Sequence, residues 1–354
     1  MTNLDSPELY ARLDKAGMRR EIAGLPAQCI QAWNQALEFK LPPDYSEVNK
    51  VVIIGMGGSA IGGDLLKALT LKLRRPQVIV HRDYGLPDYV DDRTLIIASS
   101  YSGNTEETLS GFEQALNLPC KKLVTSTGGK LTALAQEKGV PFFVIQHVSP
   151  PRVALGYSLL PLMAIMHNLG FLSGKLAEVE EMAALLEKLN KGWQEDVPQK
   201  ENMAKQLALT LHKKVVVVYG AGILSDVARR WKTQINENAK AWTFFEILPE
   251  LNHNAVLGYS HPADMAGKIY VLMLRCPSIH HRTLLRYEVT GELLGLKKIP
   301  YKVIDSQGGS DLAMMMSLVL LGDWVSFYLA MLYGIDPTPV PQIDLLKSRL
   351  AGEK

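Results

Sequence analysis

Short apolar runs alternate along the chain with longer segments whose apolar residues recur at helical spacing. In the first half of the chain these runs are Val51–Ile54, Gln77–Val80, Leu95–Ala98, Lys122–Thr125 and Phe142–Ile145. Apolar residues at consecutive positions predict strands that are buried on both faces. Helix-length segments, such as Thr105–Leu116 and Lys130–Lys138, separate the runs, which predicts parallel strands joined by helical crossovers.

The same alternation restarts beyond residue 200. Its strand candidates are Val215–Tyr219, Thr243–Leu248, Ile269–Leu274 and Tyr301–Ile304. Each half opens on a β-branched strand that runs into a Gly-x-Gly turn, which indicates a duplicated doubly wound unit. The predicted fold class is therefore α/β, with two doubly wound parallel-sheet domains of the flavodoxin-like αβα sandwich type and helical arms at both ends.

The pattern divides the chain into five parts: an N-terminal helical arm (1–40), a first domain (41–175), a linker helix (176–200), a second domain (201–335) and a C-terminal helix (336–354). Helical spacing in the first arm is interrupted near Gly24–Pro26. The linker is rich in Glu and Lys with Leu at helical spacing. A rigid, proline-rich connector, Gly334–Pro341, leads into the last helix, which carries Lys347.

One stretch, Leu312–Tyr333, is long and apolar enough to cross a bilayer. Its single charge, Asp323, lies beside Gly322 in the middle of the stretch, and its flanks are not basic. Positively charged flanks would be expected of a membrane span. A buried core helix is the better interpretation, and no membrane association is predicted.

Composition narrows the class of protein further. The 354 residues include 38 Lys plus Arg and 36 Asp plus Glu, a formal net charge of +2, so nucleic acid is not an expected partner. With 47% hydrophobic and 21% charged residues the chain is globular. Three scattered cysteines, Cys29, Cys120 and Cys276, form neither a disulfide framework nor a zinc site. The first residues lack a signal-peptide profile, so a cytoplasmic location is expected.

The first turn reads Gly55-Met56-Gly57-Gly58-Ser59-Ala60 and precedes a predicted helix. Glycines let the backbone approach a ligand, and the helix N-terminus presents free N–H groups to an anion. Gly57, Gly58 and Ser59 are therefore candidates for binding a phosphate. The same pattern also fits a dinucleotide-binding turn, with Asp83 a little beyond the usual distance for a ribose-binding acid.

The third predicted strand ends in a second polar turn, Ser99-Ser100-Tyr101-Ser102-Gly103-Asn104-Thr105. Open parallel sheets bind ligands at the carboxyl ends of their strands. Ser100, Ser102 and Thr105 could surround a compact phosphate, whereas a dinucleotide site has no obvious need of this turn. Capping of the following helix by Thr105 is the simpler alternative.

In the second half, a helix that begins near Ser225 carries Glu237, and His253 follows the next strand between two asparagines. An acid and a histidine on consecutive strand-end connections could supply a base and a second proton-transfer group. Taken singly they would be ordinary surface residues. Arg152 follows a strand of the first domain and could stabilise a developing anion. His261, His280 and His281 lack metal-ligand spacing, so no metal site is predicted.

These motifs resemble those of the sugar-isomerase (SIS) domain proteins, and within them the bifunctional phosphoglucose/phosphomannose isomerases. The resemblance spans nearly the whole chain. It rests on the two polar turns, Pro151-Arg152, Asn236-Glu237-Asn238, Glu250-Leu251-Asn252-His253-Asn254, and Asp336-Pro337-Thr338-Pro339 leading to Lys347. The Asn-Glu-Asn and Asn-His-Asn combination is specific, whereas many sugar-phosphate binders share the hydroxyl-rich turn.

The resemblance implies an enzyme that interconverts glucose 6-phosphate, mannose 6-phosphate and fructose 6-phosphate through an enediolate, without a metal or redox cofactor. By the same resemblance, Ser59, Ser100, Ser102 and Thr105 hold the phosphate, and Glu237 moves the proton between C1 and C2. His253, with Lys347, opens and closes the sugar ring, and Arg152 stabilises the enediolate. In relatives the histidine comes from a second subunit, which implies a homodimer with shared active sites. Thr338 is expected near the pocket that selects the sugar.

Three other interpretations stay open on the sequence. A non-catalytic sugar-phosphate sensor would keep the polar turns without needing Glu237 or His253. An amino-sugar phosphate isomerase is the nearest enzymatic alternative, although no glutamine-hydrolysing segment is evident. A nucleotide-dependent dehydrogenase is the third.

Overall fold

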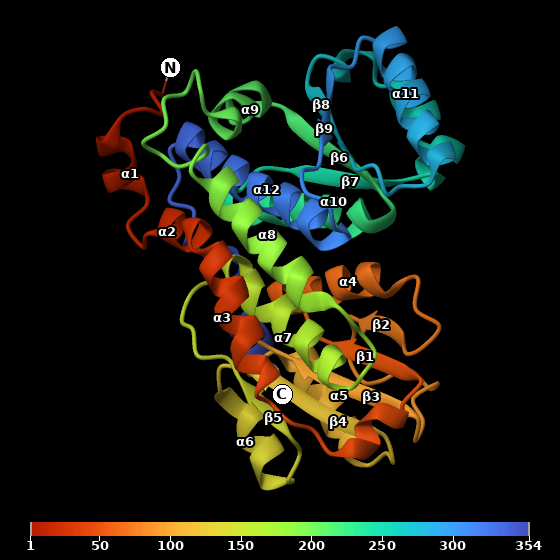
Figure 1. Cartoon of the computed structure of the whole chain (residues 1–354). Helices are drawn as coiled ribbons and strands as arrows, with labels where there is room; N and C mark the ends of the chain where they lie inside the picture. The colour runs from red at the N-terminus through yellow and green to blue at the C-terminus, as the bar shows by residue number, and fades with distance from the viewer. Residues whose placement is uncertain (1, 353–354) are drawn as a thin grey trace.

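The computed structural model describes residues 2–352, and its two halves each contain a parallel sheet, as Figure 1 shows. The first sheet has the order β2-β1-β3-β4-β5, and all neighbouring strands are parallel. Its strands are β1 (Lys50–Ile54), β2 (Gln77–His81), β3 (Thr94–Ser99), β4 (Lys121–Ser126) and β5 (Phe142–Val144). This is the doubly wound order of a flavodoxin-like sheet, as predicted.

The second sheet has the order β7-β6-β8-β9, again entirely parallel. Its strands are β6 (Val215–Ala221), β7 (Thr243–Leu248), β8 (Ile269–Arg275) and β9 (Tyr301–Asp305). The first four strands of each half are therefore arranged in the same way. The prediction of two related doubly wound units is confirmed, and the first sheet has one further edge strand.

Alternate residues of the first sheet enter different apolar clusters. Val51, Ile53, Leu95, Ile97 and Leu123 belong to the large core between the sheets. Val52, Ile54, Ile96, Ala98 and Val124 belong to a separate cluster with α5 (Glu106–Leu116) and α6 (Gly129–Glu137). Because helices cover both faces, consecutive central positions of β1 and β3 are apolar, which explains why the sequence shows continuous rather than alternating runs.

The large core is built by helices from both halves of the chain. On the side of the first sheet they are α4 (Gly57–Thr70) and α7 (Leu155–Asn168), and on the side of the second they are α10 (Ser225–Ala239) and α12 (Asp311–Tyr333). α8 (Lys175–Asn190) and α9 (Met203–Leu211) pack on α12, and α11 (His281–Leu296) connects β8 to β9. The contact between α4 and α10 joins the halves, and this junction holds the candidate site.

α12 is the stretch that could have crossed a membrane. It is long and apolar enough to do so, yet its apolar window is 100% buried within the protein. Even Asp323 in its middle is only 3% exposed. The prediction of a core helix is confirmed.

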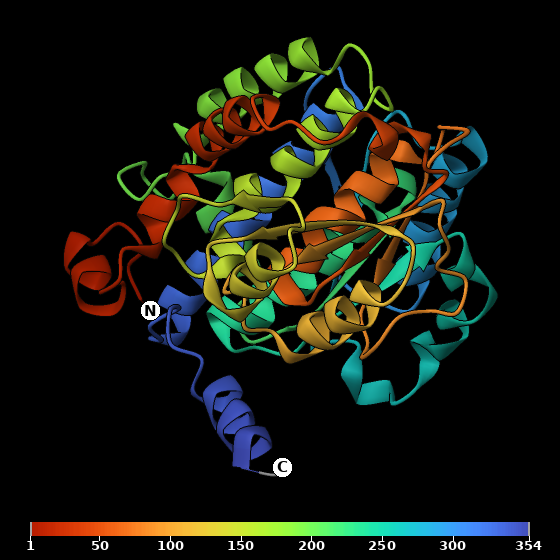
Figure 2. The same cartoon turned by 90° about the horizontal axis from the view of Figure 1, so that it is seen from below.

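The N-terminal arm consists of α1 (Pro7–Leu13), α2 (Met18–Ala23) and α3 (Leu25–Leu37), so the predicted interruption falls at Gly24. The arm packs through α3 on α7 and α8. The C-terminal helix α13 (Pro341–Gly352) projects from the body, as Figure 2 shows. Four of its apolar side chains are exposed: Ile343, Leu345, Leu346 and Leu350. A single chain therefore leaves the apolar residues of α13 uncovered.

Candidate active site

The two hydroxyl-bearing turns follow β1 and β3, which are adjacent strands. β1 is followed by α4, which packs toward the large core, and β3 by α5, which packs on the opposite face of the sheet. The chain thus leaves the two strands in opposite directions. In open parallel sheets this divergence makes the crevice in which ligands bind.

The first turn runs directly into α4. Gly57 has a φ of +50°, a conformation that residues with a Cβ rarely adopt. The Oγ of Ser59 accepts a hydrogen bond from the backbone N–H of Tyr101 at 2.9 Å, which links the two turns. This bond uses a lone pair of Ser59 and not its proton. No side chain caps the start of α4 within the described residues, so its first N–H groups can serve an anion.

The second turn brings Ser100 and Thr105 together, with 2.9 Å between Oγ and Oγ1. Thr105 occupies the N-cap position of α5, but its side chain makes no capping hydrogen bond there. Capping therefore does not account for the Thr105 hydroxyl. Ser102 is exposed, and its Oγ accepts the N–H of Asn104 at 3.3 Å.

Tyr101 ties these turns to the segment that carries Arg152. Its hydroxyl donates to the carbonyl of His147 at 2.7 Å and accepts the N–H of Ser149 at 3.2 Å. The segment then forms the short helix η2 (Pro151–Val153), which lies against the first turn of α4. A Cβ on Gly58 would stand 2.7 Å from the carbonyl oxygen of Pro151 and 3.3 Å from the nitrogen of Arg152. Glycine is required here because the two backbones touch.

Gly58→Ala is expected to destabilise the protein by about 1–3 kcal/mol, because backbone must move to admit the methyl group. Turnover should fall with it, since η2 carries Arg152. The urea midpoint and kcat measure the two effects. The matched control is Gly295→Ala in α11, where nothing lies within 4 Å of the added Cβ. If Gly58→Ala were as stable as the wild type, the backbone of Pro151 and Arg152 would not pack tightly against residue 58.

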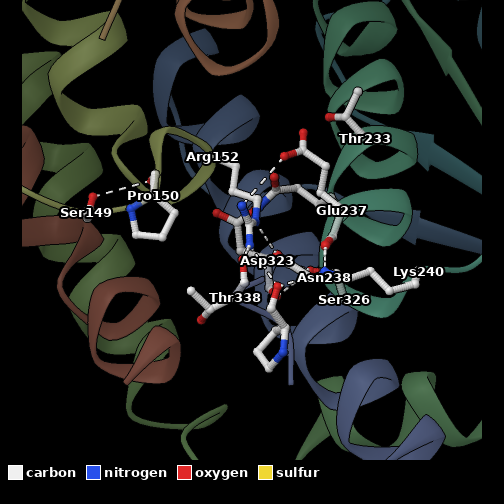
Figure 3. Close-up of polar contacts among 12 residues, drawn as sticks. Ser149, Pro150, Arg152, Thr233, Glu237, Asn238, Lys240, Asp323, Ser326 and Thr338 are labelled. Carbon is white, nitrogen blue, oxygen red and sulfur yellow. Dashed lines mark hydrogen bonds and ion pairs between the residues drawn. The ribbon is translucent and has the colours of Figure 1, made fainter. Parts of the chain in front are cut away.

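Arg152 is buried and joins both halves of the chain, as Figure 3 shows. Its Nε donates to Oδ1 of Asn238 at 2.7 Å, and its Nη2 donates to the carbonyls of Pro337 at 2.7 Å and Thr338 at 2.8 Å. Its Nη1 lies 3.7 Å from Oε2 of Glu237. Burial lowers the pKa of Arg152, while the charges of Glu237 and Asp336 oppose that change.

Glu237 lies in the last turn of α10, and 29% of its side chain is exposed. It is therefore partly shielded from water and faces a fixed cation. Lys240, just beyond the helix, donates to the carbonyl of Pro337 at 3.0 Å. Burial and then the Arg152 charge lower the pKa of Lys240. Thr338 lies beside Arg152, and within residues 2–352 its Oγ1 is buried without a hydrogen-bond partner.

His253 does not join Glu237 within one chain. Glu237 precedes β7, whereas His253 ends η4 (Glu250–His253), which follows β7. The strand between these positions has six residues and spans about 20 Å. His253 is exposed, as is Lys347 on the projecting α13. The structure thus gathers the hydroxyl turns, Arg152 and Glu237, and leaves the other two predicted residues elsewhere.

Four polar residues around Arg152 were given no role by the sequence: Arg230, Asn238, Asp323 and Ser326. They are all buried. The signals in the sequence were the Asn-Glu-Asn motif and the lone charge of Asp323 in an apolar helix. Neither signal indicates which residues Asn238 or Asp323 contacts in the fold.

Two surface hollows of residues 2–352 lie away from this junction. One of about 610 Å³ lies between α5 and α6, and one of about 390 Å³ lies near Lys240 and Trp242. Neither is lined by Arg152, Glu237 or the hydroxyl turns. Within residues 2–352 no three His, Cys, Asp or Glu side chains are grouped to hold a metal ion.

Comparisons with known proteins identify relatives of this chain. A family model described as the bacterial phospho-glucose isomerase C-terminal SIS domain matches residues 200–350. A bifunctional phosphoglucose/phosphomannose isomerase of Caldicellulosiruptor bescii is 42% identical over 94% of this chain and 99% of its own length. A protein of the same description from Aquifex aeolicus is 35% identical over 90% of this chain and 95% of its own. A D-glucosamine-6-phosphate 4-epimerase of Sulfolobus acidocaldarius is 32% identical over 65% of this chain and 71% of its own.

Solved structures support the fold. A hypothetical protein of Thermus thermophilus superposes with a TM-score of 0.72 at 20% identity, covering 98% of this chain and 92% of that one. The C-terminal domain of a glucosamine-fructose-6-phosphate aminotransferase from Francisella tularensis gives a TM-score of 0.69 at 15% identity, covering 91% and 98%. At such identities the likeness concerns the fold alone.

Proposed function

Because this chain belongs to the bifunctional phosphoglucose/phosphomannose isomerase family, we propose that it interconverts glucose 6-phosphate and mannose 6-phosphate with fructose 6-phosphate by proton transfer through an enediolate. One observation carries the assignment of residues: Glu237 faces the guanidinium of Arg152 at 3.7 Å, and Arg152 adjoins the turn that bears Ser59. A base and a cation thus lie next to an anion-binding turn.

The phosphate is held by Ser59, Ser100, Ser102 and Thr105 together with the N-termini of α4 and α5. This group does not react, so its binding energy serves to orient the reacting carbons beside Glu237. The hydroxyls and amides are neutral donors, which suits a compact dianion that must also be released.

The carboxylate of Glu237 removes the proton from C2 of the aldose, and the C1 carbonyl oxygen gains negative charge as the C1–C2 double bond forms. Arg152 stabilises this enediolate electrostatically. Return of the proton to C1, with transfer of the hydroxyl proton between the two oxygens, gives the ketose. Glucose and mannose phosphates are epimers at C2, so both form an enediolate in which that centre is planar. One base can therefore serve both aldoses when the intermediate turns about its C2–C3 bond and presents either face of C2 to Glu237.

Electrons are conserved within the substrate, since C1 is reduced as C2 is oxidised. We therefore expect activity without a redox cofactor. Because Arg152 supplies positive charge beside the enediolate, we also expect activity without a metal ion. Purified protein incubated with fructose 6-phosphate should form both epimeric aldoses, with and without a chelator. Formation of neither aldose would remove the proposed function, and loss of activity with the chelator would contradict the metal-free reaction.

Ring opening is assigned to His253 of the partner subunit in a homodimer, with Lys347 as a second group. Two features support a shared site. Within one chain, Glu237 precedes β7 and His253 follows it, and the six residues of that strand span about 20 Å. The exposed apolar residues of α13, the helix that carries Lys347, also suit coverage by a second copy.

An amino-sugar phosphate is the second candidate substrate. This candidate is favoured by the Sulfolobus acidocaldarius relative, a D-glucosamine-6-phosphate 4-epimerase that is 32% identical to this chain. Glucosamine 6-phosphate tested beside fructose 6-phosphate separates the two functions. Turnover of the amino sugar alone would replace the isomerase proposal. Binding of both sugars without turnover of either would indicate a sensor.

Ser59→Ala is expected to raise the KM for fructose 6-phosphate about tenfold, because a hydrogen bond to a charged group is lost. The inhibition constant of inorganic phosphate should rise by the same factor, with kcat little changed. Ser46→Ala, whose exposed hydroxyl donates to the Pro43 carbonyl, is the control. Unchanged KM and inhibition constant would place the phosphate elsewhere.

The division of the chain into parts 1–40, 41–175, 176–200, 201–335 and 336–354 remains our proposal for the domains. A cytoplasmic location is also proposed. It is supported by the three cysteines, which are buried and free of disulfides.

A further inference from the structure

Asp323 is the lone charge that the sequence places inside the apolar helix α12, and the reaction above gives it no role. It is 3% exposed, and its carboxylate faces α10. Nη2 of Arg230 lies 2.8 Å from its Oδ1 and 2.7 Å from its Oδ2, and Nε2 of Gln234 donates to Oδ1 at 2.8 Å. The same Nη2 of Arg230 donates to the backbone carbonyl of Arg152 at 3.1 Å. The carboxylate of Asp323 is thus connected to the main chain of Arg152.

A second chain of hydrogen bonds connects α12 to the side chain of Arg152. Oγ of Ser326 donates its only proton to the carbonyl of Asp323 at 2.8 Å, so it must accept the bond from Nδ2 of Asn238 at 2.9 Å. This orients the amide of Asn238 with Oδ1 toward Nε of Arg152, 2.7 Å away. Figure 3 shows these residues converging on Arg152.

These contacts decide which nitrogen of Arg152 stays available. A guanidinium has five N–H donors. Three of them are used, by Oδ1 of Asn238 and by the carbonyls of Pro337 and Thr338. The remaining two are on Nη1, the nitrogen that lies 3.7 Å from Glu237. The donors that are left over therefore face the proposed base.

We propose that Asp323, Arg230 and Ser326 are positioning residues, which hold Arg152 so that its Nη1 is presented to the enediolate formed by Glu237. This inference rests on the proposed function. None of the three touches the substrate. They act on Arg152 from two directions, its carbonyl and its Nε, and fix both its position and the plane of its guanidinium.

Stability alone is a poor explanation for this network. Burying an ion pair costs desolvation that its attraction often fails to recover, and apolar residues of similar volume commonly replace such pairs without loss. Burial raises the pKa of Asp323, and the charge of Arg230 opposes this only in part. α12 is otherwise apolar near its middle, so a Leu–Met contact would suit the interface between α10 and α12, with Gln234 losing the acceptor of its Nε2.

The experiment replaces both charges at once, in the double variant Arg230→Met with Asp323→Leu, and separately tests Ser326→Ala. If the residues position Arg152, kcat for glucose 6-phosphate falls about a hundredfold in the folded double variant. The KM changes by less than about twofold, because the phosphate turns are untouched. The primary isotope effect with C2-deuterated glucose 6-phosphate rises toward its full value, since proton transfer becomes rate-limiting. Ser326→Ala shows the same changes to a smaller degree.

A purely structural role would lower the fraction of active molecules and leave the KM and the isotope effect of the remainder unchanged. Lys205→Met is the matched control. Lys205 is a fully buried cation that packs on Tyr328 of α12 and donates to Asp5. Neither of these residues is a hydrogen-bond partner of Arg152. The Lys205→Met variant should have a lower thermal midpoint of unfolding, with the KM and the isotope effect of the wild type.

Wild-type kcat and isotope effect in the folded double variant would overturn the inference. If that variant does not fold, Ser326→Ala decides alone, and an unchanged isotope effect there overturns it equally. The wild-type protein is measured in the same series. If it has no isomerase activity, the proposed function and this inference are both wrong. An active wild type beside unaffected variants would remove the inference only.

Discussion

Glu237→Gln should lower kcat for fructose 6-phosphate by about a thousandfold while sugar-phosphate binding persists, because general base catalysis contributes a factor of this order. Glutamine has nearly the same shape, but it cannot accept the proton from carbon. Glu237 lies in the last turn of α10 and is partly exposed, so its replacement leaves the core intact. Calorimetric binding of fructose 6-phosphate and a coupled assay of turnover measure the two effects.

Deuterium exchange gives a more direct measurement of the same step. Wild-type protein in deuterated water should incorporate deuterium at C1 of fructose 6-phosphate even before net conversion, and Glu237→Gln should not. Glu246→Gln, an exposed carboxylate on β7, is the control that should behave as wild type. Normal turnover and exchange in Glu237→Gln would exclude this residue as the base.

Mixing two inactive variants should restore activity if the active site is shared between subunits. Glu237→Gln lacks the base, and His253→Asn lacks the group assigned to ring opening. After dissociation and random reassociation, half of the dimers are hybrids, each with one complete site, so about a quarter of wild-type turnover should return. The gain in turnover on mixing is large because each variant alone is nearly inactive on the cyclic sugar.

The test depends on demonstrating the hybrids, which native mass spectrometry can count when one variant carries a mass label. The control is a mixture of Glu237→Gln with Arg152→Lys. Both of these changes affect the same side of the site, so no hybrid contains a complete set. An inactive mixture of Glu237→Gln and His253→Asn with hybrids present would show that His253 acts within its own chain or has no role.

The position of Arg152 has a consequence for the whole molecule. The residue follows the first sheet, yet its side chain contacts Asn238 of α10 and the carbonyls of Pro337 and Thr338 beyond α12. Its backbone lies against Gly58 at the start of α4. Relative movement of the two halves would therefore separate the cation from the base or from the phosphate turns. We expect the junction between α4 and α10 to be rigid during the reaction.

The sequence by itself determined the strands, the crossover helices and the two polar turns. Strands buried on both faces are apolar at most consecutive positions, and turns that approach an anion closely favour Gly, Ser and Thr, so both features are recorded in consecutive residues. The buried helix α12 was recognised despite its length, because the charge of Asp323 in its middle would not suit a lipid environment.

Only the tertiary structure decided which of the polar residues meet. Arg152 contacts residues 86 and 185 positions away in the chain, and no local periodicity records such distances. Glu237 and His253 are close in sequence, but Glu237 precedes β7 and His253 follows it, so they lie at opposite ends of that strand. Asp323 was visible as an isolated charge, while its partner Arg230 lies on another helix. Local spacing reflects burial, whereas the meeting of distant side chains depends on how α4, α10 and α12 pack against one another.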